Sequence, residues 1–381
     1  MSHEARPELH VNLDVLRRNW QRVGARFTGQ VVGAVVKHDA YGLGLPQVVP
    51  TLAAAGCRHF WVDTPHRGLA VRAALADPSL PVQVFVLYGL AGMDMADQAA
   101  HSLTPVLNSL DEVDRVRDHA RRTATRHNVA IQLDTGLTRL GLREADLATL
   151  ARNPSLLDGL RITDWVTQLS RFDAPLDPAC VQQRRLFEHW TAQLPPARRC
   201  VATSAGMFAD QHLHFDHARV GSALYGIDTL RDPAQPLDVV ATLTAPVLQV
   251  VTVPAQTFIG YGNQFCTQRP SVIATVAAGY GDGLPATLAA GGRVSIHGQL
   301  APIVGGVAMG LLSVDITDLP IGCVKPGDAA ELYGTCVPLS DVAARAGLAP
   351  AAVLVPSAVK AERVYHLAEV IARPTHLETV A

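Results

Sequence analysis

Residues 31–220 repeat one pattern: a short apolar segment of strand length, then a longer segment rich in alanine and leucine with helical spacing. This alternation predicts β–α–β units, in which right-handed helical crossovers connect the parallel strands of one sheet. The sequence supplies eight such repeats, which favours a closed (β/α)8 barrel, although an open doubly wound sheet fits the same alternation. The predicted strands are Val31–Val36, His59–Val62, Val82–Leu87, Leu103–Val106, Val129–Leu133, Arg161–Val166, Arg199–Ala202 and Ala218–Val220, and the clearest helices are Leu45–Gly56, Pro65–Ala76, Ser109–Ala124, Glu144–Arg152 and Ala179–Leu194.

The pattern changes near residue 230. Residues 231–237 contain two prolines and no helical spacing, which predicts a linker. Beyond the linker, segments rich in valine, threonine and glycine predict a small β domain with one helix at Leu339–Ala346. The chain has 381 residues, more than one compact domain usually holds. We therefore predict a TIM-type barrel domain over residues 1–230 and a mostly-β domain over residues 238–381.

Composition excludes several classes of partner. A formal net charge of −2 with 17% charged residues argues against a nucleic-acid-binding surface. No segment has the length and apolar purity of a membrane span, and the polar N-terminal residues do not resemble a signal peptide. The six cysteines lack zinc-binding or redox spacing. We therefore expect a cytoplasmic protein that binds neither nucleic acid nor membrane.

The most informative segment is VVGAVVKHDAYGLG, residues 31–44. A predicted buried strand ends at Lys37, and ligands of parallel sheets bind at the carboxyl ends of the strands. A lysine in that place can form a Schiff base with an aldehyde cofactor, whereas the alternative is a rim lysine that extends into water. Tyr41 and the glycines at 42 and 44 favour the first interpretation, because glycine allows a backbone to approach a ligand closely.

Polar residues also follow other predicted strands. Loops after the seventh and eighth strands of such barrels commonly bind phosphate through backbone N–H groups and a hydroxyl. Ser204, Gly221 and Ser222 have the right chemistry for that role, and the alternative for each is a helix N-cap or a turn glycine. The remaining strand-end candidates are Asp134, Thr135, Arg139, Gln168, Thr203, Gly206 and Arg219.

Two further segments contain candidate residues. In AAGYGDGLP, Tyr280 stands between glycines in an exposed turn, and the alternative is a turn tyrosine with no special role. The segment HLHFDH contains His212, His214 and His217, but it lacks the helical spacing of a zinc site. We predict no metal site.

These segments together resemble the alanine racemase family, and the resemblance covers nearly the whole chain. Seven motifs occur in the family's order: VVKHDAYGLG, LDTGLTRLG, TSAGMF, ARVGSALYGID, FIGYGNQF, AAGYGDGLP and PIVGGVAMGLLSVDIT. The resemblance implies a pyridoxal 5'-phosphate-dependent amino-acid racemase, with alanine as its substrate and a head-to-tail homodimer as its assembly.

The resemblance also implies residue roles. Lys37 would bind the cofactor and act as one base, while Tyr280 from the other subunit would be the second base on the opposite face of the substrate. Racemisation needs two such groups, because the proton leaves one face of a planar centre and returns to the other. The other implied roles are Tyr41, Ser204, Gly221 and Ser222 for the phosphate, Arg219 for the pyridine nitrogen, Arg139 for the phenolic oxygen and the substrate, and the backbone N–H of Met309 for the substrate carboxylate.

Several residues depart from the family pattern. Gln132 replaces a lysine that is carbamylated in many members and that steadies the arginine matching Arg139, and an amide can orient that arginine only by hydrogen bonding. Gln168 replaces a histidine, and no tyrosine occurs between Tyr333 and Tyr365, where the family has one that binds phosphate. These changes leave two alternatives open: a racemase of a different amino acid, or a cofactor-binding relative with impaired catalysis. The other departures are Thr203, Gly306, Gly310 and Ala286.

Overall fold

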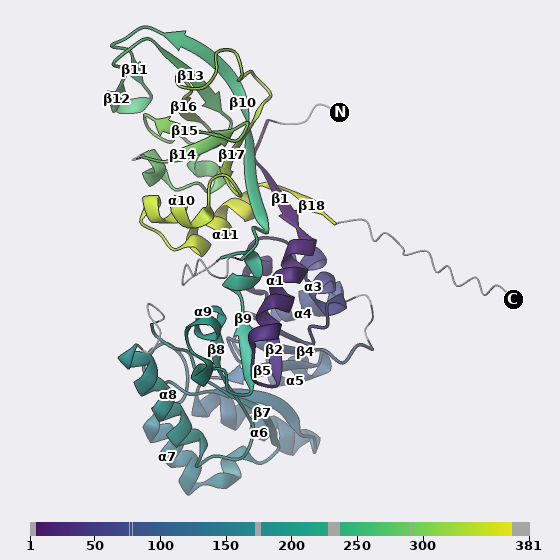
Figure 1. Cartoon of the computed structure of the whole chain (residues 1–381). Helices are drawn as coiled ribbons and strands as arrows, with labels where there is room; N and C mark the ends of the chain where they lie inside the picture. The colour runs from purple at the N-terminus through teal and green to yellow at the C-terminus, as the bar shows by residue number, and fades with distance from the viewer. Residues whose placement is uncertain are drawn as a thin grey trace, which may run out of the picture.

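The structure is a computed structural model that describes residues 5–75, 77, 79–171, 177–227, 237–289 and 291–367. It contains a closed parallel barrel of eight strands and an 8-stranded sheet built mainly from the C-terminal part of the chain. Figure 1 shows the barrel below and the β domain above, joined along one side by long strands. The predicted closed barrel followed by a mostly-β domain is confirmed, and the open doubly wound alternative is wrong.

The barrel strands follow one another around the barrel in chain order, and β9 pairs with β2 in parallel to close it. All eight predicted strands are confirmed to within a few residues. The strands are β2 (Val31–Val35), β3 (His59–Val62), β4 (Gln83–Val86), β5 (Leu103–Leu107), β6 (His127–Gln132), β7 (Leu160–Val166), β8 (Arg198–Thr203) and β9 (His217–Val220). The helices of this domain are α1 (Leu13–Arg26), α2 (Lys37–Tyr41), α3 (Leu45–Ala54), α4 (Pro65–Ala74), α5 (Met95–Ala100), α6 (Leu110–Thr123), α7 (Glu144–Arg152), η1 (Pro154–Leu157), α8 (Pro178–Thr191), α9 (Ser204–Ala209), η2 (Gln211–Leu213) and η3 (Ser222–Tyr225).

Helix α6 illustrates why the predicted helices form. The side chain of Ser109 caps its first turn by accepting a hydrogen bond from the backbone N–H of Glu112. Its buried side chains, Val113, Val116 and Ala120, recur at helical spacing and face the barrel. Acidic residues in the first turn and arginines in the last turn complement the helix dipole.

The interior of the barrel is layered. One apolar layer takes a side chain from most of the strands, including Trp61 and Phe85, whose rings stack with centroids 3.9 Å apart. Nearer the amino ends of the strands lies a polar layer, where buried Asp164 pairs with Arg198 and with His217, each at 2.8 Å. The polar layer holds charged groups away from water, so its hydrogen bonds fix the strands that carry it.

The first strand of the chain does not join the barrel. Strand β1 (Glu8–Asn12) pairs in parallel with the last strand, β18 (Glu362–His366), and antiparallel with β10 (Ala241–Val253). The sheet order is β13-β16-β15-β14-β17-β10-β1-β18. The domain limits of 1–230 and 238–381 stay a prediction, with β1 as a segment of the first range that completes the sheet of the second. The predicted linker lies outside the described residues except for Leu237.

The second domain contains the predicted helix α10 (Leu339–Ala346), followed by α11 (Pro350–Lys360), which the sequence left unassigned. Among the described residues, no single helix has both the length and the apolar composition needed to cross a membrane. The other elements of the second domain are β11 (Phe258–Ile259), η4 (Tyr261–Asn263), β12 (Phe265–Cys266), β13 (Ser271–Val276), η5 (Tyr280–Asp282), η6 (Ala286–Ala289), β14 (Arg293–Ile296), β15 (Gln299–Val304), β16 (Leu312–Asp315) and β17 (Ala329–Tyr333).

Candidate active site

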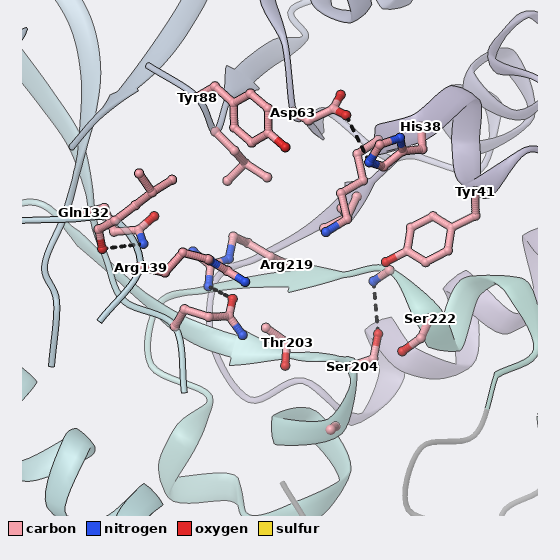
Figure 2. Close-up of a pocket in the computed structure, with 17 residues that line it drawn as sticks. His38, Tyr41, Asp63, Tyr88, Gln132, Arg139, Thr203, Ser204, Arg219 and Ser222 are labelled. Atoms are coloured by element: carbon pink, nitrogen blue, oxygen red, sulfur yellow. Dashed lines mark hydrogen bonds and ion pairs between the residues drawn. The ribbon is translucent and has the colours of Figure 1, made fainter. Parts of the chain in front are cut away.

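A pocket of about 360 Å³ opens at the carboxyl ends of the barrel strands. Figure 2 shows that its polar side chains come from opposite sides of the barrel and converge on one space. All seven barrel residues predicted for the site line this pocket, and Gly221 is the one without a side chain. The other six are Lys37, Tyr41, Arg139, Ser204, Arg219 and Ser222.

The strand that carries Lys37 ends in an unusual turn. The four residues after Lys37, from His38 to Tyr41, all have left-handed backbone angles, with φ between 51° and 58°. Each non-glycine residue in that conformation costs about 1–2 kcal/mol, so other contacts have to hold the turn.

Contacts from a distant strand hold this turn. The carboxylate of Asp39 accepts a hydrogen bond from the backbone N–H of Leu45 at 2.8 Å and pairs with Arg363 at 2.8 Å. The hydroxyl of Tyr365 donates to the carbonyl of Leu43 at 2.9 Å. Arg363 and Tyr365 lie on β18, so a strand of the second domain's sheet fixes the position of the lysine turn.

The electrostatics of the pocket favour an uncharged amine at Lys37. Burial lowers the pKa of Lys37, and the positive charges of Arg139 and Arg219 lower it further, while Asp63 opposes them. A lysine with a lowered pKa is a better nucleophile and a better base near neutral pH.

The loops after β8 and β9 form a cradle of the kind predicted for phosphate. The hydroxyl of Ser204, which is 4% exposed, accepts hydrogen bonds from the backbone N–H groups of Gly221 at 3.0 Å and Ala223 at 3.1 Å. A Cβ atom on Gly221 would lie 2.6 Å from the hydroxyl oxygen of Tyr41, so any larger residue here would displace the Tyr41 ring. Burial raises the pKa of Tyr41 to about 12, which keeps its hydroxyl protonated and able to donate.

Arg219 is held by hydrogen bonds to a backbone carbonyl and to a side-chain amide. It is 4% exposed, and its Nη2 donates to the carbonyl of Thr167 at 2.7 Å and to Oε1 of Gln168 at 3.2 Å. Its guanidinium lies 5.5 Å from the ring centroid of Trp61. Both of these hydrogen-bond acceptors are neutral, so neither of them offsets the positive charge of the guanidinium.

A buried network from helix α8 supports this arginine. Gln183 donates to the carbonyl of Gln168 at 3.2 Å and to the hydroxyl of Thr135 at 3.3 Å, and it accepts from the backbone N–H of Ser170 at 2.9 Å. Sequence reasoning missed Gln183, because the residue lies on a helix and its spacing matches no motif.

Gln132 acts differently from the sequence-based expectation. Its amide donates to the carbonyl of Leu140 at 3.1 Å, so it holds the loop of Arg139 through the backbone instead of the guanidinium. The side chain of Arg139 is exposed at the mouth of the pocket.

Tyr280 and Met309 do not line this pocket within the part of the chain that the structure describes. They lie together in the second domain, where the backbone N–H of Tyr280 donates to the carbonyl of Ala308 at 2.9 Å and that of Gly281 donates to the carbonyl of Met309 at 2.7 Å. Tyr280 is 49% exposed and Met309 is 66% exposed. The residues predicted for the site therefore fall into two separate groups, one in each domain.

Sequence reasoning also missed three pocket residues, His38, Asp63 and Tyr88. Asp63 and Tyr88 follow β3 and β4, so the strand-end rule that found the other candidates would have found them too. His38 lies directly after Lys37.

The histidine segment has structural partners. His214 contacts the carbonyl of Met207 at 3.0 Å, and His217 pairs with Asp164 inside the barrel. Within the described ranges, no three histidine, cysteine or carboxylate side chains gather in a way that could hold a metal ion.

Comparisons with known proteins agree along the whole chain. The family model described as "Alanine racemase, N-terminal domain" matches residues 11–229, and "Alanine racemase, C-terminal domain" matches residues 240–365. The chain is 38% identical to an alanine racemase of Acidiphilium cryptum, over 90% of this chain and 93% of that protein. It is 36% identical to a catabolic alanine racemase of Agrobacterium fabrum, over 89% of this chain and 87% of that protein. The crystal structure of alanine racemase from Bartonella henselae with covalently bound pyridoxal phosphate has a TM-score of 0.90, is 30% identical, and covers 95% of this chain and all (100%) of that one.

Proposed function

This chain belongs to the alanine racemase family, and we propose that it is a pyridoxal-phosphate-dependent racemase that interconverts L- and D-alanine. The observation that carries the proposal is the position of Lys37: a lysine with a lowered pKa faces a phosphate-type cradle across one pocket.

The pocket fits the cofactor. The cradle contains the hydroxyls of Ser204 and Ser222, and the backbone N–H of Gly221, which here donates to the Ser204 hydroxyl, would turn to a bound phosphate; Gly221 leaves room beside Tyr41. Arg219 would face the pyridine nitrogen, where its positive charge disfavours protonation of that nitrogen. Pyridoxal phosphate, when bound, withdraws electrons from the α-carbon of the substrate and so makes the α-proton acidic.

Two bases on opposite faces would move the proton. Lys37 Nζ takes or returns it on one face, and the hydroxyl oxygen of Tyr280 does so on the other. Because Tyr280 and Met309 stand outside the pocket of their own chain, we propose that they complete the pocket of a second copy in a head-to-tail homodimer. Their exposure supports this arrangement, since an apolar loop that is exposed in one chain can be buried against another.

The substrate contacts follow from the same arrangement. The exposed guanidinium of Arg139 would contact the phenolic oxygen of the cofactor and the substrate, and the backbone N–H of Met309 would receive the substrate carboxylate. We also propose a cytoplasmic location, which the six free cysteines support because disulfides are rare in that compartment.

A direct assay tests the proposal. The purified full-length protein, loaded with pyridoxal phosphate, should convert L-alanine into D-alanine until both are equal. The absence of turnover with alanine and with every other amino acid would overturn the proposal.

One observation favours a second candidate, a racemase of a different amino acid. A Cβ atom on Gly310 would meet nothing within 4 Å, so the residue next to Met309 leaves open space where the family has an aspartate. A panel of amino acids in heavy water, scored by α-deuterium uptake, separates the two candidates. Bound cofactor without deuterium uptake for any amino acid would instead indicate a relative with impaired catalysis.

A further inference from the structure

Asp63 is the one acidic side chain among the described residues that line the pocket. We propose that Asp63 is a positioning residue for Lys37, which anchors the lysine turn through His38 and supplies the negative charge that faces the lysine amine. The inference rests on the proposed function, because it takes Lys37 as the cofactor lysine and as one of the two bases.

The position of Asp63 follows from the barrel. It comes directly after β3, which pairs in parallel with β2, so the ends of these two strands place Asp63 beside Lys37. Asp63 is 2% exposed. Its Oδ1 accepts the backbone N–H of Thr64 at 3.0 Å, and its Oδ2 accepts Nη1 of Arg67 at 2.7 Å. These two contacts fix the position of the carboxylate.

Asp63 reaches the lysine turn through the next residue in the chain. Nε2 of His38 lies 3.5 Å from Oδ2 of Asp63 (Figure 2). His38 is also the first of the four left-handed residues, with φ at 51°. A contact at this residue therefore restrains the strained turn at the point where it leaves Lys37.

The negative charge of Asp63 opposes the effect of burial and of the two arginines on the pKa of Lys37. The titratable and charged groups that face Lys37 across the pocket are His38, Tyr41, Asp63, Tyr88, Arg139 and Arg219. Burial, Arg139 and Arg219 all favour the neutral amine, and Asp63 is the group that favours the ammonium ion. A group that must both accept and return a proton works best when neither form is strongly preferred, so a counterweight to the two arginines serves the reaction.

Two substitutions should shift the pH at which Lys37 titrates, one downward and the other upward. Asp63→Asn removes the negative charge and keeps the shape, so it should lower the pH at which Lys37 titrates by about one unit. Arg67→Gln removes the cation that partly neutralises Asp63, so it should raise that pH by about half a unit. Arg67 is partly exposed, so its variant gives a result even if Asp63→Asn folds poorly.

The control is Asp216→Asn. Asp216 also pairs with an arginine, Arg199 at 3.3 Å, but it precedes β9 at the other end of the barrel and does not line the pocket. In this variant Lys37 should titrate at the same pH as in the parent protein.

The experiment has two readouts on the cofactor-loaded enzyme. One is the pH at which the visible absorption of the lysine-bound cofactor changes, and the other is the acid limb of the pH profile of kcat for alanine, because Lys37 is free to act as a base only after substrate has bound. Opposite shifts in the two variants would support the inference, since a purely structural role gives no opposite signs. No shift in either variant, or shifts of the same sign, would overturn it. A parent protein without the visible absorption would overturn the proposed function, and this inference with it.

Discussion

Lys37 and Tyr280 each begin a short turn, and both turns pack against helix α11. A Cβ atom on Gly42, in the first turn, would lie 2.7 Å from the Cβ of Ala358, and one on Gly283, at the end of the second, would lie 2.6 Å from the carbonyl carbon of Pro356. One helix of the second domain therefore contacts both the turn that begins at Lys37 and the turn that begins at Tyr280.

Lys37→Ala should abolish covalent attachment of the cofactor. The chain contains three lysines, and the other two, Lys325 and Lys360, lie in the second domain. Borohydride reduction followed by mass spectrometry of peptides should find the cofactor on Lys37 alone in the parent, and Lys360→Ala is the matched control. Cofactor retained on another lysine of the Lys37→Ala variant would contradict the assignment.

Tyr280→Phe should keep the visible absorption and reduce turnover by about 10²-fold or more, because it removes one of two acid–base groups. Enantiomers have equal free energies, so kcat/KM must fall equally in both directions. The informative measurement is the primary isotope effect with α-deuterated L- and D-alanine. It should rise for the enantiomer whose proton Tyr280 removes; equal isotope effects for both enantiomers would contradict the two-base assignment.

Mixing two inactive variants tests the shared site. When Lys37→Ala and Tyr280→Phe chains pair at random, half of the dimers are mixed, and each mixed dimer has one pocket with both bases intact. Coexpression should therefore restore about a quarter of the parent sites. If the mixture stays as inactive as its components while size-exclusion chromatography shows dimers, Tyr280 does not act across the interface.

Gln183→Leu should lower the free energy of unfolding by about 1–3 kcal/mol, because it removes a hydrogen-bond partner of the buried Thr135 hydroxyl and of the partly buried carbonyl of Gln168. Urea unfolding measures this change. Gln182→Leu is the control on the same helix, since Gln182 is exposed. Equal effects of the two substitutions would show that the network contributes nothing specific.

His59 should make the protein less stable in mild acid. Burial, together with the positive charges of His217 and Arg198, lowers the pKa of His59 from 6.5 to about 3. The unfolded chain thus takes up a proton at a pH where the folded chain does not. The stabilisation is complete above pH 6.5 and is lost as the pH falls towards 3, by at most about 1.4 kcal/mol per pH unit for one proton.

Urea unfolding at a series of pH values checks this dependence. His59→Gln should flatten it, while His101→Gln, at an exposed histidine, should not. A parent protein whose stability is constant between neutral pH and about pH 4 would contradict the expectation.

The sequence predicted the barrel well because the strand–helix alternation is local. Lys37, Ser204 and Gly221 line one pocket, since the carboxyl ends of parallel strands share one face, while their roles stay a prediction. The same rule applies to Asp63, which follows a strand that carries no family motif.

Other features depend on contacts that no local pattern encodes. The alternation of Leu9, Val11 and Leu13 fits a strand, but nothing in it indicates pairing with residues 362–366. Gln132 looked like a partner for Arg139, and only the loop geometry directs its amide to Leu140 instead. The network of Gln183 joins a helix to two strand ends, which requires the tertiary structure.

The parallel pairing of β1 with β18 has a consequence for biosynthesis. The emerging chain contains all eight barrel strands long before residues 362–366 exist, so the barrel can fold first. Until then β1 lacks one of its two neighbours, and the lysine turn lacks Arg363 and Tyr365. Residues 362–366 must therefore leave the ribosome before Lys37 reaches its final position, and a chain that lacks them would have a barrel but no properly formed lysine turn.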